Sequence, residues 1–285
     1  MRGGATVGVT IQRVPRILMI AGSDSGGGAG IQADLKTVMA LGGYATTAIT
    51  AITAQNTVGV TDVLVLDPVL VIAQIDAVLS DIGADAIKIG MLGSAAVADA
   101  VADRLSRDDV SVPIVFDPVM VATSGATLAD AATIAAFERL MRLATLVTPN
   151  LPELAILSPD GAEVLARRIG SSVLVKGGHG ADAMLVDRLV HADGTAHAWC
   201  DARIETVHTH GTGCTLASAI ALGLARGDPI EDAIATARRF VRASIERAPG
   251  LGRGGGPLGH ARHDGLALTQ AAGIPPRNSR IAPDG

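Results

Sequence analysis

The sequence predicts an α/β fold in which a central, mainly parallel β-sheet is flanked by helices on both faces. Short apolar runs alternate along the chain with longer segments of helical periodicity, which is the pattern of strand–helix–strand units. Apolar residues make up 48% of the 285 residues and aromatic residues only 2%, so Ala, Val, Leu and Ile must build the core. Such a core suits strands that are buried under helices on both sides.

The expected strands are short apolar runs, and the expected helices are longer segments with apolar residues at helical spacing. No internal repeat or linker divides the chain between a loose leader at 1–14 and a loose tail at 266–285, so residues 15–265 are expected to form one domain. The strands are expected at 17–21, 45–53, 63–66, 86–89, 112–116, 146–147, 173–175 and 184–186, and the helices at 31–41, 68–79, 95–105, 129–143, 163–168, 215–225 and 230–245.

Charge and cysteine content exclude several classes of protein. The net charge is −5 without a Lys/Arg cluster, so nucleic acid is not an expected partner. The uncharged stretch 38–61 contains paired glycines and six threonines, which fit a loop and a strand better than a membrane span. Cys200 and Cys214 make neither a disulfide framework nor a metal motif, which indicates a soluble protein in the reducing cytoplasm.

The segment His208-Thr-His-Gly-Thr-Gly-Cys214 immediately precedes the expected helix 215–225. A Gly-x-Gly turn that opens a helix presents unpaired backbone N–H groups at the positive end of the helix dipole, which favours phosphate. Cys214 would lie in the first turn, where the dipole lowers a thiol's pKa and favours thiolate, so the loop could hold a phosphoryl group beside a base. The alternative is a plain tight turn followed by a small core cysteine.

Polar or glycine-rich segments follow six of the expected strands. They begin at Gly22, Ala54, Gly90, Asp117, Thr148 and Lys176. Ligands bind at the carboxyl ends of parallel strands, so these six segments are expected to form one site.

The segment Gly22–Gly30 is neither a dinucleotide fingerprint nor a phosphate-binding P-loop motif, because the third glycine and the Gly-Lys pair are absent. Its small residues would let a flat ligand approach the backbone, although a flexible turn is the alternative. Asp24 could bond the ligand or brace the turn.

Asp117 and Glu153 follow strands and suit Mg²⁺ held through waters and phosphate oxygens. Asn150 and Glu153 also have the spacing of a helix capping box. Lys176 directly follows an apolar run and could reach phosphates, or it could lie in solvent. The histidines share no metal-ligand spacing with the cysteines, so no zinc site is expected.

Together these segments resemble the hydroxymethylpyrimidine/phosphomethylpyrimidine kinase family of thiamine biosynthesis, within the ribokinase-like superfamily. The resemblance runs from Ile17 to His263. The segments that carry it are Ala21-Gly-Ser-Asp24, Gly27-Gly-Ala-Gly-Ile-Gln-Ala-Asp-Leu-Lys-Thr37, Ala54-Gln-Asn-Thr57, Lys88-Ile-Gly-Met-Leu92, Thr148-Pro-Asn-Leu-Pro-Glu153, Lys176-Gly-Gly-His179 and Thr209-His-Gly-Thr-Gly-Cys-Thr215.

The resemblance implies transfer of the ATP γ-phosphoryl to the hydroxymethyl group of 4-amino-5-hydroxymethyl-2-methylpyrimidine and then to the resulting monophosphate, by a homodimer that uses Mg²⁺. It implies an anion hole at Gly211, Thr212, Gly213 and Cys214, with Cys214 as the catalytic base. The implied pyrimidine pocket consists of Gly22, Ala29, Gln55, Met91 and Val119. Asp24, in the loop after the first strand, is expected to be a further substrate-binding residue. Lys176 is implied for the ATP phosphates, and Asp117, Asn150 and Glu153 for the Mg²⁺ and phosphate region.

The chain departs from the family pattern at three places. The first loop reads Asp24-Ser-Gly-Gly-Gly28 rather than Asp-Pro-Ser-Gly-Gly, Thr53 stands where Val is common, and no Asn precedes His260. Two other functions remain open: a pyridoxal or pyridoxine kinase, and a non-catalytic ligand-binding regulator. Many pyridoxal kinases carry Asp at the position of Cys214, and binding alone would need no base.

Overall fold

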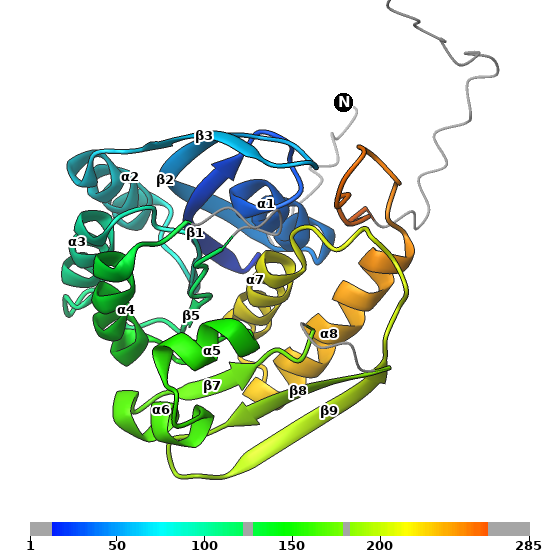
Figure 1. Cartoon of the computed structure of the whole chain (residues 1–285). Coiled ribbons are helices and arrows are strands. Elements are labelled where there is room, and N and C mark those ends of the chain that lie inside the picture. The colour runs from blue at the N-terminus through cyan, green and yellow to red at the C-terminus, as the bar shows by residue number, and fades with distance from the viewer. Residues whose placement is uncertain (1–12, 122–127, 179–182, 262–285) are drawn as a thin grey trace, which may run out of the picture.

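A computed structural model describes residues 13–121, 128–178 and 183–261 (Figure 1). Its strands and helices alternate through most of this length, as the sequence predicts. They are β1 (Arg16–Asp24), α1 (Gly30–Ala40), β2 (Tyr44–Gln55), β3 (Val60–Val65), α2 (Pro68–Asp81), β4 (Ala86–Ile89), α3 (Ala95–Leu105), β5 (Ile114–Phe116), α4 (Ala131–Leu143), β6 (Leu146–Val147), α5 (Leu151–Leu157), α6 (Ala162–Ile169), β7 (Ser172–Val175), β8 (Met184–Val190), β9 (Ala196–Ala202), α7 (Thr212–Ala225) and α8 (Ile230–Glu246).

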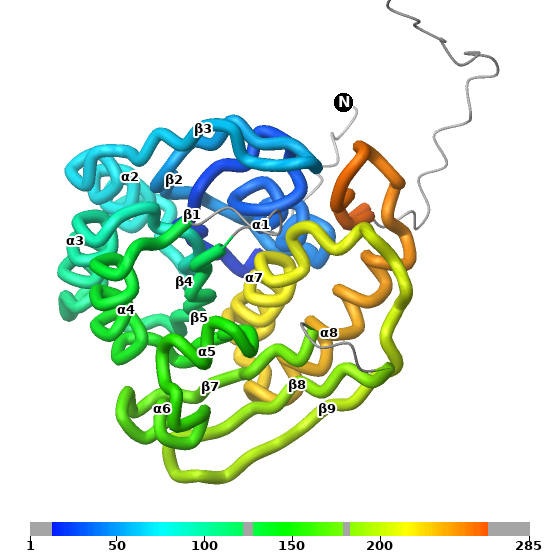
Figure 2. The backbone as a smooth tube through the Cα atoms, in the orientation of Figure 1, coloured from blue at the N-terminus to red at the C-terminus, as the bar shows by residue number. Residues whose placement is uncertain are grey.

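The described strands form one sheet in the order β3-β2-β1-β4-β5-β6-β7-β8-β9. The six central strands, β2, β1, β4, β5, β6 and β7, are parallel to one another. Strand β3 pairs antiparallel with β2 at one edge, and β8 and β9 are antiparallel to their neighbours at the other edge. The chain leaves β1 toward β2 on one side and later returns through β4 on the other, as the tube in Figure 2 traces. The strand order therefore reverses beside β1, and a crevice is expected at the carboxyl ends there.

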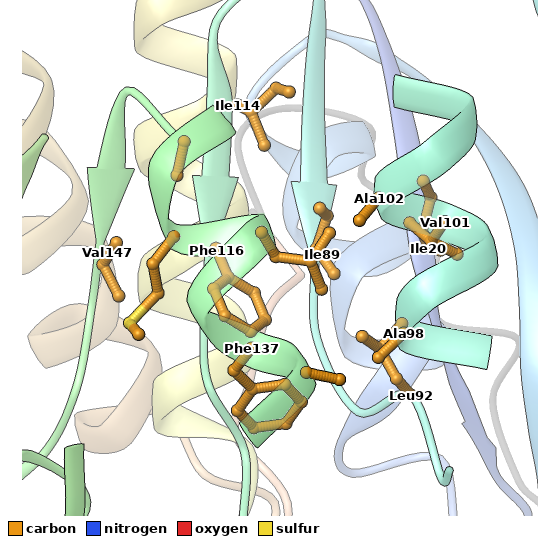
Figure 3. Close-up of a cluster of buried hydrophobic side chains, with 14 of the residues drawn as sticks. Ile20, Ile89, Leu92, Ala98, Val101, Ala102, Ile114, Phe116, Phe137 and Val147 are labelled. Atoms are coloured by element: carbon orange, nitrogen blue, oxygen red, sulfur yellow. The ribbon is translucent and has the colours of Figure 1, made fainter. Parts of the chain in front are cut away.

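Helices cover both faces of the sheet, and successive side chains of β1 point to opposite faces. Leu18 and Ile20 pack into a core that α2, α3, α4 and α6 share, whereas Ile17 and Met19 pack into a second core with α7 and α8. In the first core, the rings of Phe116 and Phe137 meet edge to face at a centroid distance of 5.1 Å (Figure 3). The prediction of a mainly parallel sheet between two helical layers is confirmed.

Several helices begin at capping residues that the sequence supplies. The side chains of Asp67, Ser94 and Asp130 accept hydrogen bonds from backbone N–H groups in the first turns of α2, α3 and α4. Gly170 ends α6 in the left-handed conformation, at φ 72°. These local signals fix where each helix starts or stops between the strands.

Some predicted boundaries are wrong. Strand β9 and helix α5 were not predicted, β2 continues through Gln55, and α7 begins at Thr212 rather than at residue 215. The expected helix at 129–143 begins at Ala131. Within the described ranges, every helix falls short of the length and apolarity that crossing a bilayer requires.

Candidate active site

A cleft of about 790 Å³ lies at the carboxyl ends of the parallel strands. Residues from all six polar segments that follow the strands line it, so the prediction that they assemble into one site is confirmed. The cleft also brings together every residue that the sequence assigned to catalysis or binding. Those lining residues are Gly22, Asp24, Ala29, Gln55, Met91, Asp117, Val119, Asn150, Glu153, Lys176, Gly211, Thr212, Gly213 and Cys214.

The first turn of α7 forms one wall of this cleft. Gly211 is the N-cap at φ 87°, and Thr212, Gly213 and Cys214 are the first three helical residues. Among the described residues, no acceptor is found for the backbone N–H groups of Gly213 and Cys214. Unpaired N–H groups at the positive end of a helix dipole attract anions, so this turn has the properties of a phosphate site.

The expected low thiol pKa at Cys214 is wrong. Cys214 is partly exposed to the cleft, but burial of its sulfur raises the pKa to about 11. The nearby ammonium of Lys88 and the N–H of Gly30 lower the pKa, and the carboxylates of Asp34 and Asp117 oppose them. The helix dipole is a local effect, and here the loss of hydration outweighs it. The thiol is therefore protonated at neutral pH in the free protein.

A polar cluster lies beside the first turn of α7 in the cleft. The Lys176 Nζ lies 2.6 Å from Asp117 Oδ1 and 4.0 Å from Glu153 Oε2. The Thr148 hydroxyl donates to Asp117 Oδ1 at 3.0 Å. A Cβ added to Gly213 would lie 3.4 Å from both Lys176 Nζ and Asp117 Oδ2, so the first turn of α7 packs close to this pair. The alternative of a solvated Lys176 is wrong, because only 15% of its side chain is exposed.

Glu153 caps a helix and also lines the cleft. It completes a capping box with Asn150: the Asn150 side chain accepts from the Glu153 N–H, and the Asn150 N–H donates to Glu153 Oε2, each at 2.8 Å. The same carboxyl group lines the cleft. Burial raises the pKa of Glu153 in spite of the opposing charge of Lys176. A cation that entered the cleft would therefore favour the ionised form.

Asp24 braces the loop that follows β1. Its Oδ1 accepts from the Gly26 N–H at 2.8 Å, and its Oδ2 accepts from the N–H groups of Gly28 and Ala29 at 3.0 and 2.9 Å. The His210 Nε2 lies 2.9 Å from the same Oδ2. Burial would raise the pKa of Asp24, but the bonds from His210 and the amides outweigh it and lower the pKa. The bracing interpretation is confirmed, although Asp24 also lines the cleft.

Packing between glycines joins this loop to the α7 turn. A Cβ added to Gly211 would lie 1.9 Å from the Gly28 carbonyl oxygen, and a Cβ on Gly28 would lie 2.3 Å from the His210 ring. Gly211 also needs its positive φ. The two glycine-rich loops therefore form one wall whose backbones touch.

Another part of the cleft wall is mostly apolar. Gly22, Ala29, Met91 and Val119 line it together with the polar side chain of Gln55. A Cβ on Gly22 would lie 3.0 Å from Met91 Sδ, so the glycine lets the Met91 side chain pack against the end of β1. This arrangement suits a small ring that has one polar edge.

Two features of the site were missed from the sequence. One is a fully buried ion pair between Lys88 and Asp34, to which Ser218 donates a hydrogen bond. The signal was a lysine within the otherwise apolar strand β4. Ser218 lies one turn after Cys214 on α7, so the Lys88–Asp34 pair lies beneath the first turn of α7.

The other missed feature is the set of contacts that the glycine-rich segment after α8 makes. The Gly256 carbonyl accepts from the His210 N–H at 3.2 Å, and the His260 Nε2 lies 2.9 Å from the Thr215 hydroxyl. The N–H groups of Arg253 and Gly254 donate to Thr57 Oγ1. The segment therefore ties the end of the described chain to the α7 turn and to the loop after β2.

Some predictions lie outside the described residues: His179, the leader at 1–12 and the tail at 266–285. Within the described ranges, no group of three or more His, Cys, Asp or Glu side chains is arranged to hold a metal ion.

A family model described as phosphomethylpyrimidine kinase matches residues 24–259. The chain belongs to the phosphomethylpyrimidine kinase family. As a member of this family it is a phosphotransferase of thiamine biosynthesis, which confirms the resemblance seen in the sequence.

Relatives of this kinase family match most of the chain. A hydroxymethylpyrimidine/phosphomethylpyrimidine kinase from Rhizobium meliloti is 48% identical over 257 residues, covering 85% of this chain and 96% of the relative. A bifunctional thiamine biosynthesis protein from Geobacter sulfurreducens is 49% identical over 256 residues, which cover 86% of this chain. The chain spans about half, 52%, of that longer relative.

A solved structure with a similar fold is an ADP complex of the pyridoxal kinase from Bacillus subtilis. Its TM-score is 0.78 at 33% identity, and the match covers 87% of this chain and 98% of that protein. The phosphomethylpyrimidine kinase family therefore shares its ribokinase-like fold with pyridoxal kinases.

Proposed function

We propose that the chain transfers the γ-phosphoryl group of ATP to the hydroxymethyl group of 4-amino-5-hydroxymethyl-2-methylpyrimidine, and then a second phosphoryl group to the monophosphate. The observation that carries this proposal is the shared cleft, in which the first turn of α7 packs close to the Lys176 cluster at Gly213 and against the loop after β1 at Gly211. A phosphate held at that turn would lie between a donor nucleotide and a flat acceptor. Membership of the kinase family supports the same reaction.

ATP is the proposed phosphoryl donor, bound against Lys176 and the N–H groups of Gly213 and Cys214. These groups supply a positive charge and unpaired hydrogen-bond donors on the same side of the cleft. Phosphoryl transfer depends mainly on positioning and on neutralising phosphate oxygens, which is what such groups provide. The ADP complex of the similar pyridoxal kinase supports a nucleotide as the ligand.

Mg²⁺ fits the residues near Lys176. Asp117 Oδ1 accepts from Thr148 and Lys176, but no partner of its Oδ2 is found in the described ranges. Among the residues that the structure describes, Asp117 and Glu153 are the carboxylates within 4.0 Å of the Lys176 Nζ. Mg²⁺ bound with a nucleotide often uses one or two carboxylates and completes its shell with phosphate oxygens and water. The ion, when bound, would neutralise negative charge on the phosphates. We propose Asp117 and Glu153 as its protein contacts, partly through water, with Asn150 in the adjoining phosphate region.

Cys214 is the proposed base for the first transfer. Its raised pKa makes the thiolate a strong base but a scarce species at neutral pH, so most of the rate must come from positioning. The monophosphate that accepts the second phosphoryl group is already an anion and needs a base less. The proposal therefore assigns Cys214 a larger share in the first transfer than in the second.

The proposed pyrimidine pocket consists of Gly22, Ala29, Gln55, Met91 and Val119, which line the apolar end of the cleft. Asp24 is proposed to act on the acceptor indirectly, because its carboxylate oxygens hold the loop amides. The apolar residues would cover the faces of the ring and Gln55 would meet its polar edge. Such a division is typical of small-molecule sites.

Pyridoxal is the main competing acceptor, since the fold is shared with a pyridoxal kinase. Cys214 and the family match favour the pyrimidine, and the presence of both Lys176 and Cys214 in the cleft disfavours a non-catalytic regulator. A coupled assay of ATP consumption with the pyrimidine alcohol, its monophosphate and pyridoxal separates the three. We expect turnover with the two pyrimidines to exceed that with pyridoxal. A preference for pyridoxal would reject the proposal, and so would no ATP consumption with any acceptor.

The chain is further proposed to act as a homodimer in the cytoplasm, with residues 15–265 as one domain. Exposed apolar side chains on β3 and at the start of α2 support self-association; Leu64, Val69 and Leu70 are between 52% and 78% exposed. Both cysteines are unpaired, which suits a reducing compartment. Light scattering on the purified chain tests the dimer, and a monomer at micromolar concentration would reject it.

A further inference from the structure

The glycine-rich segment at residues 250–260, here named the C-terminal strap, contacts two parts of the cleft that are far apart in the sequence. Near its start, two backbone N–H groups of the strap donate to the Thr57 Oγ1 at 3.2 and 3.3 Å. At its end, the His260 Nε2 lies 2.9 Å from the Thr215 hydroxyl. In Figure 1 the strap is the orange segment beyond α8, next to the turn between β2 and β3. The strap therefore connects the loop after β2 with the first turn of α7.

The strap packs against its neighbours directly through its backbone. At four of its glycines, an added Cβ would overlap an atom of another part of the chain. These overlaps are Gly252 and Gly254 with Thr57, Gly256 with the ring of His208, and Gly259 with the carbonyl oxygen of Arg247. The Gly259 N–H also donates to the Ser244 carbonyl oxygen on α8 at 2.9 Å. The strap is therefore fixed to α8 at one place and reaches both parts of the cleft from there.

The two residues that the strap holds are close neighbours of the proposed site. Thr57 follows Gln55 by two residues, and Thr215 directly follows Cys214. The described wall of the cleft includes Gln55 and Cys214 but neither Thr57 nor His260. Thr57 and His260 can therefore affect a bound molecule only through the residues whose backbone they hold in place.

The contact between His260 and Thr215 joins two neutral groups. His260 is 4% exposed, and burial lowers its pKa to about 4, so its ring carries no charge at neutral pH. A neutral imidazole offers one donor and one acceptor to its surroundings. A neutral amide side chain can therefore replace it in this contact, whereas an aliphatic side chain cannot.

We propose that the C-terminal strap is a positioning element of the kinase, which holds the acceptor pocket after β2 and the first turn of α7 at the spacing that phosphoryl transfer requires. The inference rests on the proposed function and adds Thr57, Gly254 and His260 to it as positioning residues. The strap does this from outside the cleft, by binding the loop after β2 near its start and Thr215 at its end.

A positioning role predicts a particular kinetic signature. Transfer requires the reacting atoms to lie almost in contact, and a displacement of about 1 Å can cost about 100-fold in rate. The groups proposed to bind ATP and the ring lie in the cleft and are unchanged when the strap is released. Release should therefore lower kcat and leave both KM values nearly unchanged. A strap that only stabilises the fold would change the melting temperature without this separation of kcat from KM.

The first test displaces the strap from Thr57. Gly254→Ala places a methyl group against the Thr57 carbonyl oxygen, and Gly59→Ala is the matched control, because Gly59 lies in the loop after β2 without a positive φ and has open space around it. We expect Gly254→Ala to lower kcat with the pyrimidine alcohol by about tenfold or more, with both KM values within about threefold, and Gly59→Ala to match the wild type. An unchanged kcat in Gly254→Ala, or a loss carried mainly by KM, would overturn the inference.

The second test releases the other end and decides the matter even if Gly254→Ala does not fold. His260→Leu removes the hydrogen bond with Thr215, and His260→Gln keeps a polar partner. We expect kcat to fall about three- to tenfold in His260→Leu and to return to within about twofold of the wild type in His260→Gln. Equal losses in both variants, or no loss in His260→Leu, would overturn the inference.

The double variant Gly254→Ala/His260→Leu shows whether the two contacts act as one connection. A strap released at either end no longer fixes the spacing, so the double variant should lose little more than the worse of the single variants. Losses in kcat that multiply would mean two independent local contacts and would overturn the inference.

Hydrogen exchange measures the connection without using activity. In the wild type the Thr215 N–H donates to the Gly211 carbonyl oxygen at 2.9 Å, and two strap N–H groups donate to Thr57. We expect exchange at Thr215 to accelerate about fivefold or more in Gly254→Ala, and exchange at the two strap amides to accelerate similarly in His260→Leu. Unchanged exchange at the far end in both variants would overturn the inference. A wild type that phosphorylates no acceptor would instead reject the proposed function, and the exchange rates would still decide whether the strap connects the two parts.

Discussion

Replacing Lys88 with methionine tests how much the Lys88–Asp34 ion pair beneath the first turn of α7 contributes to the free energy of unfolding. The side chains of Lys88 and Asp34 are both 0% exposed, and the Lys88 Nζ lies 3.0 Å from each Asp34 oxygen. Burial alone would lower the pKa of Lys88, but the charges of Asp34, Cys214 and Asp117 and the hydrogen bond to Asp34 together outweigh it, and the pKa is raised. Methionine fills similar space without the charge, so the variant leaves a carboxylate in the core with only the Ser218 hydroxyl, at 2.7 Å, as its remaining partner.

The expected loss follows from the complete burial of the pair. Removing one partner of a buried ion pair lowers the free energy of unfolding by about 3–5 kcal/mol, because the other charge loses its compensation. For a domain of this size, each kcal/mol shifts the melting temperature by about 2–4 °C, so Lys88→Met should melt about 6–20 °C below the wild type. The double variant Lys88→Met/Asp34→Leu removes both charges and should recover most of that loss.

Chemical and thermal denaturation followed by circular dichroism measure these differences. Lys36→Met is the matched control, because it makes the same replacement at an exposed lysine that donates to a loop carbonyl. It should stay within about 1 kcal/mol of the wild type. The reasoning fails if Lys88→Met is as stable as this control, or if the double variant is no more stable than Lys88→Met alone.

Three further predictions concern the cleft. Gly211→Ala should destabilise the chain and raise the KM for ATP, because its Cβ would meet a backbone oxygen at 1.9 Å. Gly227→Ala is the control for the positive φ, because Gly227 has φ 85° and open space around it. Equal effects of the two variants in denaturation and kinetics would refute the clash. Lys176→Met should lower kcat/KM for ATP by about 100-fold or more in steady-state assays, whereas a loss under about threefold would remove Lys176 from the phosphate site. In a Cys200→Ser background, alkylation of Cys214 by iodoacetamide should accelerate about tenfold per pH unit between pH 7 and 10, since its pKa is about 11 and thiolate forms as pH rises; a plateau below pH 8 would contradict the raised pKa.

The sheet could be predicted from the sequence because its parallel strands are continuous apolar runs. Strand β9 has no such run: Ala196–Ala202 contains histidine, tryptophan and aspartate and pairs only with β8 at the edge of the sheet. Helix α5 has seven residues and a proline in its first turn, too few for a helical period to be recognised. Both elements depend on tertiary pairing or on a cap more than on hydrophobic periodicity.

The site could be predicted as a set of strand ends but not as a network. Strand ends converge in any parallel sheet, so the meeting of Gln55, Asp117 and Lys176 follows from the order of segments. The contact of His210 with Asp24 joins residues 186 positions apart, and no local pattern encodes it. The pKa of Cys214 was predicted in the wrong direction for the same reason. A helix terminus is visible in the sequence, whereas the burial that outweighs it is a property of the folded chain.

The most direct test of the proposed reaction is a rapid-quench, single-turnover measurement of both phosphoryl transfers in the wild type and in Cys214→Ala. The pyrimidine alcohol is the acceptor in one experiment and its monophosphate in the other, each with ATP and Mg²⁺. We predict that the wild type performs both transfers and that Cys214→Ala slows the first by about 100-fold or more, while the second is slowed much less. Equal losses in the two rates would contradict the role of Cys214, and an inactive wild type would contradict the assignment of the cleft.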